Sequence, residues 1–581
     1  MVRIRVARPE EAAALTELVL RSKAHWGYGR EFLERCAPEL RIDAHEVGPR
    51  RVVVAEEGRS APVGVASLEG DGARGTLGLL FVEPAAIGRG VGRALYRHAV
   101  ARARELGMRR LVVDADPHAA GFYRALGAEE SGGRNGLVRF EVELAPPAAW
   151  VGAWTGGRAA VHLGNVAEFN AQFGDASLDR EQRAAHHYAC LAAFYSPRPA
   201  ALVLPRPVPA EWLDLLGRQL GWADVEVYDG LAGRGGPGLS AVVRGREALA
   251  ERLTGLGLPL VPWGHTEEFA RLAGLPWRAE ALRYESKAEA HALFERIAAA
   301  GGHPGIVVPG QWRARTRWAA ARLLAGRARA GQDTVLKSEH GVGGSGTTVV
   351  TARDVREAGG ARAVLRRLPR GPLLVEEYVA GPGPDGVRDL TYDGFVDGSG
   401  RVHEVGVALM DVAGTGYRGA TTGPGVVPSW AEKPMLAFGE AVGRELAAAG
   451  HRGWFDVDFV ADGAGGLAPT EANLRLTGPS VAFMAGARLD EVRGGTHLVR
   501  VIDRVELGAR LPGAQLAELF EATAYGCAEL GAVFLPAIPT AAFARAPWIG
   551  VVVAARTPEA LDAAADLVRS KARAVGEGLR E

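Results

Sequence analysis

Several features that would assign the chain to a common protein class are scarce or missing. The chain of 581 residues has three cysteines, Cys36, Cys190 and Cys527, which lie far apart. They support neither a disulfide framework nor a cysteine-based zinc site, so a reducing cytoplasm is the expected compartment. No uninterrupted apolar run reaches the roughly 18 residues that a membrane span needs, and the charged N-terminal segment has no signal-peptide core. The 68 basic residues are balanced by 68 acidic residues, which argues against a nucleic-acid-binding protein.

Lysine is also rare. Of the 68 basic residues 63 are arginine, and the five lysines are Lys23, Lys287, Lys337, Lys433 and Lys571. Together with the abundant alanine and glycine, this bias is typical of a GC-rich bacterial genome. Each remaining lysine is therefore a candidate for a role that arginine cannot fill.

The length predicts about three to five domains, and the 48% hydrophobic content is enough for packed cores. The pattern of strands and helices predicts a multidomain protein of the α/β and α+β classes. We expect five segments: an α/β unit at 1–145, a Pro-, Gly- and Ala-rich linker at 146–158, a small α/β domain with a parallel sheet at 159–264, a domain at 265–505 that is helical up to about residue 330 and then dominated by strands, and a C-terminal α/β extension at 506–581.

A glycine-rich turn lies between a predicted strand and a predicted helix in the first unit. Gly88, Gly90 and Gly92 alternate along LLFVEPAAIGRGVGRALYRHAV. Glycines let backbone N–H groups approach an anion closely, and the N-terminus of the following helix presents further unpaired N–H groups. The turn is therefore either a phosphate-binding loop or only a tight turn. It is neither a Walker A loop nor a dinucleotide-binding fingerprint.

Over residues 1–145 the chain resembles the GNAT acyltransferase superfamily, which implies a mixed sheet with flanking helices. Three motifs carry the resemblance: GRGVG at 88–92, DxDPHAxxFYxxLG at 114–127, and SKAHWGY at 22–28, a substrate-side segment in a subset of such proteins. The resemblance implies that acetyl-CoA is bound. One departure is Ile87, which stands where the family usually has Gln or Arg.

The GNAT resemblance also implies roles for individual residues. The pyrophosphate of acetyl-CoA would be held by the loop residues Gly88, Arg89, Gly90, Val91 and Gly92. A splayed strand containing Leu80 and Val82 would pair its backbone with the pantetheine arm, and Tyr123 would reprotonate the thiolate leaving group.

Some residues of the first unit allow two interpretations. Tyr123 is alternatively a core aromatic, and Glu83 is either a general base or, more plainly, a solvated loop carboxylate. His25 and Trp26 either line the acyl-acceptor pocket or simply pack.

A second glycine-rich loop follows Lys337. The segment VLKSEHGVGGSGTTVV predicts a strand, a loop containing Gly343, Gly344 and Gly346, and another strand. Such a loop folds over phosphates as a lid and supplies backbone N–H groups, while the lysine acts as a point charge.

A polar hairpin is predicted about 120 residues later, in GWFDVDFVADGAGGLAPTEANLR. Glu471 and Asn473 lie two apart on the second strand and share a face, and we expect the hairpin to bring Asp458 opposite both of them. Two carboxylates and an amide oxygen suit Mg²⁺ that bridges nucleotide phosphates. Arg475 lies on the same face.

These features occur in the order and at the intervals that resemble the ATP-grasp ligase superfamily over about 265–505. The resemblance implies binding of ATP and Mg²⁺, with Lys287 and Lys337 at the phosphates. It makes Asp458, Glu471 and Asn473 the magnesium ligands and Arg475 a stabiliser of an acyl-phosphate. Glu376 through Val379 would form the adenine hinge, read by backbone groups of Glu377 and Val379, and Asp385 or Asp389 is an alternative for binding the ribose.

We therefore expect a bifunctional enzyme: a carboxylate–amine ligase fused to an N-acetyltransferase. The tail AYGCAELGAVFLPAIP is similar to that of pheganomycin-type peptide ligases, which implies a role in peptide natural-product metabolism. The expected substrates are amino acids or peptides, with neither nucleic acid nor membrane as a partner and with homo-oligomerisation left open. Two alternatives stay open. In the first, the N-terminal unit is a non-catalytic acyl-CoA sensor. In the second, the chain is related to ADP-forming acyl-CoA synthetases, although it has no room for their CoA-binding domain.

Overall fold

The computed structural model divides into two units. Residues 2–58, 61–144, 148–175, 178, 185–222, 224–231, 238–368 and 373–578 are described. Met1–Pro147 and Arg488–His497 make up the first unit, and Ala148–Ala487 and Leu498–Glu581 make up the second. The first two residues of the predicted linker, 146 and 147, lie outside the described residues.

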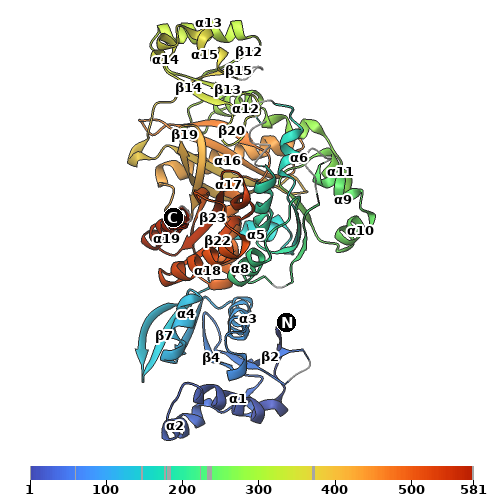
Figure 1. Ribbon diagram of the computed structural model, residues 1–581, viewed down its shortest axis with the longest axis vertical. Helices are drawn as coiled ribbons and strands as arrows, with labels where there is room; N and C mark the ends of the chain where they lie inside the picture. Colours follow the sequence, from blue (N-terminus) through green and yellow to red (C-terminus); the bar gives the residue numbers. More distant parts are fainter. Residues whose placement is uncertain are drawn as a thin grey trace. The chain divides into compact units, whose positions relative to one another are not determined.

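The first unit is built on a mixed seven-stranded sheet (Figure 1). Its strands, in spatial order, are β1 (Val2–Val6), β2 (Val53–Glu57), β3 (Gly64–Glu69), β4 (Arg74–Val82), β5 (Arg110–Ala115), β7 (Leu137–Glu143) and β6 (Glu129–Arg134). The helices are α1 (Ala12–Ala24), α2 (Arg30–Leu40), α3 (Val91–Glu105) and α4 (Ala120–Ala125). Residues of α3 and α4 belong to one buried cluster and residues of α1 to another, so the sheet has a core on each face.

Strands β4 and β5 are parallel neighbours that stay paired only briefly. Their register covers Arg74–Thr76 against Arg110–Val112, whereas β4 runs on to Val82 with β3 as its partner. The edge of β4 that faces β5 therefore opens toward its C-terminal end. This is the splayed strand that the sequence predicts around Leu80 and Val82.

The second unit begins with a small parallel sheet, as predicted. Its order is β10 (Glu226–Tyr228), β9 (Pro199–Val203), β8 (Ala160–Leu163) and β11 (Leu260–Pro262). Surrounding helices are α5 (Ala149–Trp154), α6 (Val166–Ala171), α8 (Ala210–Leu220), α9 (Leu239–Arg244), α10 (Glu247–Gly255) and α11 (Glu267–Ala273). Helix α5 lies within the segment predicted as a linker, and its Trp150 and Trp154 pack edge-on against Trp454.

Next comes a small lobe with a four-stranded sheet. Its strands, in spatial order, are β12 (Gln311–Ala314), β15 (Leu373–Glu377), β13 (Thr334–Lys337) and β14 (Thr347–Val350). Helices α13 (Arg317–Arg329), α14 (Ala352–Glu357) and α15 (Ala361–Arg366) share its buried core. Helix α12 (Lys287–Ala299) precedes the lobe. Strand β12 falls in a region for which the sequence predicts mainly helix.

An eight-stranded sheet completes the second unit. Its order is β20 (Leu467–Asn473), β19 (Gly453–Ala461), β16 (Asp389–Val396), β17 (Val402–Ala413), β18 (Gly416–Thr422), β21 (Leu498–Glu506), β23 (Trp548–Ala555) and β22 (Ala532–Ile538). Its helices are α16 (Ser429–Ala448), α17 (Gly478–Arg493), α18 (Gly513–Glu529) and α19 (Pro558–Gly578). The sheet continues across the predicted boundary at 505/506. None of the helices described is long and apolar enough to cross a membrane.

Candidate functional sites

The hairpin of β19 and β20 carries the predicted magnesium ligands in a slightly different register. Asp458 lies opposite Glu471, as expected, but Asn473 lies opposite Asp456. The Asn473 side-chain amide donates to Asp456 Oδ1 at 2.7 Å and to Asp458 Oδ2 at 3.4 Å. The expectation that Asp458 faces both residues is thus corrected, because antiparallel strands pair residues one to one. Asp456 was missed, although its place two residues before Asp458 puts it on the same face.

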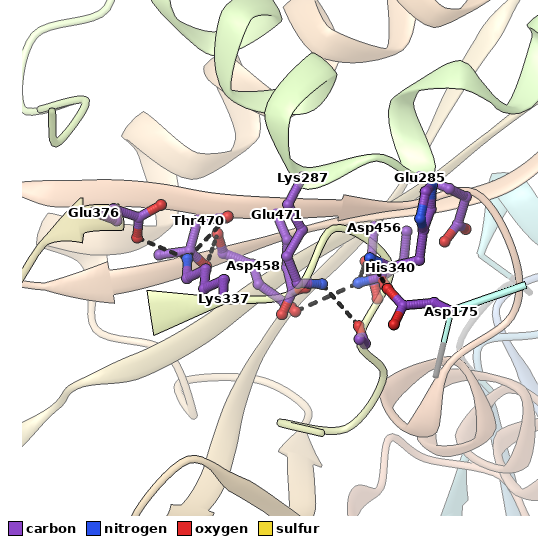
Figure 2. A network of polar contacts seen from close by, with 12 residues as sticks. Asp175, Glu285, Lys287, Lys337, His340, Glu376, Asp456, Asp458, Thr470 and Glu471 are labelled. Atoms are coloured by element: carbon purple, nitrogen blue, oxygen red, sulfur yellow. Dashed lines mark hydrogen bonds and ion pairs between the residues drawn. The ribbon is translucent and has the colours of Figure 1, made fainter. Parts of the chain in front are cut away.

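Two lysines from different elements reach this hairpin (Figure 2). Lys337, at the end of β13, lies with Nζ 2.7 Å from Glu376 Oε1 and donates to the Thr470 carbonyl at 3.4 Å. Lys287, the first residue of α12, donates to the Gly341 carbonyl at 2.7 Å and forms an ion pair with Glu471. Both lysines are buried. Two of the five lysines in the chain therefore lie against one carboxylate-bearing hairpin.

The glycine-rich loop between β13 and β14 lies against the turn that joins β17 and β18. Its backbone is closed by bonds such as Ser338 N–H to Gly346 O at 2.9 Å, and Tyr417 N–H donates to Gly343 O at 3.4 Å. Gly344 has a φ of 84°, and an added Cβ would overlap the carbonyl oxygen of Thr415. Only glycine fits at this point of the loop.

Arg475 is buried directly after β20. Its Nη2 donates to Asn473 Oδ1 at 2.7 Å, and its Nε lies 3.9 Å from Glu285 Oε1. Glu285 also accepts the backbone N–H of Leu474, and its pKa is raised because it is buried, an effect that Arg475 partly offsets. Glu285 is a second residue that sequence reasoning missed. No motif signals it, because it lies in a short helical turn before α12.

The carboxylates of the hairpin differ in how their surroundings affect ionisation. Burial raises the pKa of Asp458, and the negative charges of Asp456 and Glu471 raise it further. Burial and neighbouring Asp393 raise the pKa of Asp456 in the same way. Burial would also raise the pKa of Glu471, but Lys287 and Lys337 outweigh it and the pKa is lowered. The site thus combines a carboxylate whose ionised form is stabilised, Glu471, with two carboxylates, Asp456 and Asp458, that have too little positive charge nearby to offset their burial.

The predicted adenine hinge begins with the last two residues of β15, Glu376 and Glu377. Glu376 is held by Lys337 and by Gln311, whose side-chain amide donates at 2.7 Å. The N–H of Glu377 donates to Gly310 O at 2.9 Å, while its carboxylate accepts the Gly310 N–H at 3.0 Å. The carbonyl oxygen of Val379 accepts from Arg388 at 2.9 Å. Of the ribose alternatives, Asp389 begins β16 and its pKa is raised by burial, whereas Asp385 lies in a turn with a φ of 58°.

In the first unit, the predicted pyrophosphate loop leads directly into α3. Gly88 and Gly90 have φ values of 83° and 86°, and a Cβ added at either would meet no atom within 4 Å. Gly90 is the N-cap of α3, so the loop ends at a 15-residue helix whose first N–H groups point outward. Val91 is buried and Gly92 packs near Phe122 and Val82. Arg89 is half-exposed and pairs with Glu57 at 2.5 Å.

Tyr123 lies in the core of the first unit. Its side chain is 4% exposed and packs against the rings of Tyr96, Phe122 and Phe140. Burial raises the pKa of its hydroxyl. The structure therefore places this predicted general acid among core aromatics.

The SKAHWGY segment and the DxDPH segment meet at the end of β5. Lys23 forms a buried ion pair with Asp116, and Tyr28 OH donates to the same carboxylate at 2.9 Å. Trp26 stacks on His118 with ring centres 5.3 Å apart, and half-buried Glu83 pairs with Arg21 at 3.0 Å. His25 packs edge-on against Trp26. The two motifs thus form one cluster.

Comparison with known proteins assigns part of the chain. Among solved structures, an N-acetyltransferase (PaiA) from Thermoplasma acidophilum in complex with coenzyme A is 17% identical and covers 25% of this chain and 99% of its own, with a TM-score of 0.23. An N5-carboxyaminoimidazole ribonucleotide synthetase from Thermus thermophilus is 17% identical and covers 71% and 97%, with a TM-score of 0.37. A biotin carboxylase from Campylobacter jejuni is 15% identical and covers 60% and 76%, with a TM-score of 0.37.

No curated protein sequence matches the chain. The described residues contain no group of three or more His, Cys, Asp or Glu side chains arranged to hold a metal ion. The model of the acetyltransferase (GNAT) family matches residues 17–128, which include the glycine loop, α3 and Tyr123. The resemblance predicted for the N-terminal region is thereby confirmed, and residues 17–128 form a domain of the acetyltransferase (GNAT) family.

Proposed function

We propose that the second unit is an ATP- and Mg²⁺-dependent ligase that joins a carboxylate to an amine through an acyl-phosphate. The first unit transfers an acetyl group from acetyl-CoA to an amine. The fusion of the two activities suits successive steps on one amino acid or peptide, as in peptide natural-product metabolism. ADP-forming ligation and acetyl transfer are separate reactions, so each half is supported and tested by itself.

The observation that carries the ligase half is the meeting of Lys287 and Lys337 at the β19–β20 hairpin (Figure 2). Both ammonium groups are buried, and each is paired with a carboxylate, Glu471 or Glu376. Phosphate oxygens that enter between the lysines can replace these carboxylates as stronger ion-pair partners of the two ammonium groups. The glycine loop adds backbone N–H groups above the same place.

In the proposed reaction a substrate carboxylate oxygen attacks the γ-phosphorus of ATP, and the bond to the ADP oxygen breaks. The amine nitrogen then attacks the acyl carbon, phosphate leaves with the electrons of the C–O bond, and the nitrogen loses a proton. Lys287 and Lys337 neutralise charge on the transferred phosphoryl group. Arg475, fixed by Asn473 on the hairpin face, stabilises the acyl-phosphate.

A magnesium ion fits the chemistry of the hairpin. Asp458 and Glu471 provide two carboxylates, which are hard ligands, and Mg²⁺ needs only one or two protein carboxylates besides phosphate oxygens. Asn473 Oδ1 accepts from Arg475 in this structure, so Asn473 would join these ligands only after its amide turns. The raised pKa of Asp458, caused by burial and by neighbouring acids, marks a place that lacks positive charge. When bound, the ion would neutralise phosphate charge there. Glu377 and Val379 would contact the adenine edge through their backbones.

In the acetyltransferase half, the loop from Gly88 to Gly92 and the start of α3 would hold the pyrophosphate of acetyl-CoA. The edge of β4 at Leu80 and Val82, left open where β5 diverges, would pair with the pantetheine arm. Tyr123 would return a proton to the thiolate.

The burial of Tyr123 favours a second candidate for this half, an acyl-CoA sensor without transferase activity. A hydroxyl inside an aromatic core is poorly placed to exchange protons with substrate. The two candidates share the CoA-binding loop and differ in turnover.

Release of ADP, assayed with a panel of amino acids and short peptides and with mass detection of products, tests the ligase half. We expect amine-dependent ADP release that Lys287→Met abolishes and that Lys433→Met, a change at an exposed lysine outside the site, leaves intact. Release of CoA thiol from acetyl-CoA with the same amines tests the transferase half. Tight CoA binding without thiol release, together with a change in ADP release, would establish the sensor.

A further inference from the structure

The small lobe is far more basic than the rest of the chain. Between residues 311 and 377 the sequence has 13 Arg and Lys against six Asp and Glu, whereas the whole chain has 68 of each. The rest of the chain therefore has more acidic than basic residues, by the same number that the lobe has in excess of basic residues. A neutral protein that gathers positive charge in one lobe has a local surface suited to an acidic partner.

Part of this charge lies on α13, where Arg327 forms an ion pair with Glu377. The helix RWAAARLLAGRAR contains four arginines and no acidic residue. Arg322 and Arg329 are exposed, and neither has an acidic partner among the described residues. Arg322 lies over the ring of Trp318 at 5.9 Å, and Trp318 is 59% exposed. Exposed tryptophan beside unpaired arginine is uncommon on a surface without a partner.

A shallow hollow of about 400 Å³ lies beside this helix face. It is lined by Trp312 of β12 and by residues of α13 and the turn after it: Arg322, Leu323, Gly326, Arg327, Arg329 and Gln332. Trp312 is 39% exposed, and the guanidinium of Arg327 lies 5.3 Å from its ring centre. The hollow thus has an apolar wall and three guanidinium groups at its rim.

The hollow is not part of the proposed nucleotide site. Figure 1 shows α13 on the side of the small sheet that faces away from β19 and β20. Only Arg327 reaches the hinge, where it lies 3.3 Å from Glu377 Oε1. The arginines at positions 322 and 329 therefore have no role in the ligation chemistry derived above.

We propose that the face of α13 with Trp312 is a docking surface for an acidic polypeptide segment. Aspartate or glutamate side chains pair with Arg322 and Arg329, and one apolar side chain enters the hollow between Trp312 and Leu323. Arginine binds carboxylates in a bidentate manner, and tryptophan and arginine dominate the binding energy of protein interfaces. A protein segment fits better than nucleic acid, because both tryptophan rings already have a guanidinium over them and because the remainder of the chain is acidic.

The test measures anisotropy of a fluorescein-labelled 12-residue peptide of alternating Glu and Leu, bound to the full-length protein. The Lys–Leu peptide and a labelled oligouridylate of equal length are the comparison probes. The variant Arg322→Ser/Arg329→Ser removes the docking arginines, while Arg327 is kept because it holds Glu377. The matched control is Arg356→Ser/Arg362→Ser, which removes the same charge from exposed positions of the same lobe outside the hollow.

We expect the Glu–Leu peptide to bind, to weaken as salt rises, and to lose at least about tenfold in affinity in the docking variant but less than about twofold in the control. The Lys–Leu peptide should not bind. Equal losses in both variants would show diffuse attraction without a docking surface. Absence of peptide binding, or tighter binding of oligouridylate that depends on Arg322 and Arg329, would overturn the proposal. Both variants change exposed side chains, and unchanged urea unfolding confirms their fold.

Discussion

The ammonium group of Lys337 lies 2.7 Å from Glu376 Oε1, with both side chains buried. The pair joins two antiparallel neighbours, β13 and β15, and it connects the proposed phosphate site to the first residue of the proposed hinge. A buried ion pair contributes little net stability, but removal of one partner leaves an uncompensated charge.

Lys337→Met should therefore have two separable effects. It should lower the free energy of unfolding by about 3–5 kcal/mol, because Glu376 is left buried and unpaired, and it should abolish ATP-dependent ligation. The double variant Lys337→Met/Glu376→Gln should regain most of the stability but none of the turnover. Urea unfolding and ADP release measure the two effects. CoA binding by the first unit should be unchanged in both variants, and parallel loss of CoA binding in a folded variant would contradict the division into two independent sites.

The glycine loop offers a matched pair of substitutions. Gly344→Ala places a methyl group on the Thr415 carbonyl, so the loop can no longer lie against the β17–β18 turn. Gly343 has a similar positive φ of 59°, but an added Cβ there meets nothing within 4 Å. We expect Gly344→Ala to raise the KM for ATP at least about tenfold and Gly343→Ala to cost only the local strain of about 1 kcal/mol. Equal effects would mean that the contact with Thr415 has no role in nucleotide binding.

Much of this site could be predicted from local sequence, and the missing parts are those set by long-range pairing. The two-residue spacing of Glu471 and Asn473 places both on one face of a strand, so the polar face of the hairpin followed directly. The partner of Asn473 could not be predicted in this way, because it depends on the register of β19 against β20. The pair of Lys287 and Glu471 joins residues 184 positions apart, and no local pattern encodes it. Strand β22 shows the same limit, because AVFLPAI contains a proline and only its pairing with β23 shows it to be a strand.

The role of the pyrophosphate loop can be tested against a control glycine, Gly107, which lies beyond the other end of α3. Gly90→Val should weaken CoA binding at least about tenfold, because the side chain occupies the space above the first N–H groups of α3 and φ is 86°. Gly107→Val, just after the end of α3, meets the same kind of strain at a φ of 76° without lying near the loop. Isothermal titration with CoA checks both. If the two variants bind CoA equally well, the loop is only a turn.

His162 on β8 should make the second unit sensitive to acid. Burial lowers its pKa to about 4, and its ring nitrogens lie 2.6 Å from Ala192 O and 2.7 Å from Ser196 Oγ. Because the folded-state pKa lies below the unfolded value of 6.5, the unfolded chain binds more protons as pH falls between these values, and stability is lost. The loss should be about 2 kcal/mol at pH 5 relative to pH 7. His162→Asn should be less stable at pH 7 but should lose less between pH 7 and pH 5, as measured by urea unfolding.

Glu471→Gln and Asp458→Asn should reduce ligation alike while changing stability in opposite directions. From sequence alone, a cluster of acids predicts that removal of either charge relieves repulsion. The structure reverses the sign for Glu471, because Lys287 and Lys337 lower its pKa despite its burial, so its carboxylate stabilises the fold above the unfolded pKa of 4.5. The pKa of Asp458 is raised by burial and by Asp456. Its negative charge therefore destabilises the fold above the unfolded pKa of 3.8, and this destabilisation decreases as pH falls.

Without Mg²⁺ at pH 7.5, Glu471→Gln should therefore melt below the wild type and Asp458→Asn above it. The two differences should shrink as the pH approaches 4, where the carboxylates become protonated in the unfolded chain and, for Asp458, in the folded one. Both variants should lose most ligase turnover at every magnesium concentration, because each removes one of the two carboxylates that Mg²⁺ would use. Calorimetric melting and ADP release check these outcomes. If either variant ligates at the wild-type rate, the hairpin does not hold the metal; if Glu471→Gln melts above the wild type, Lys287 does not stabilise its carboxylate.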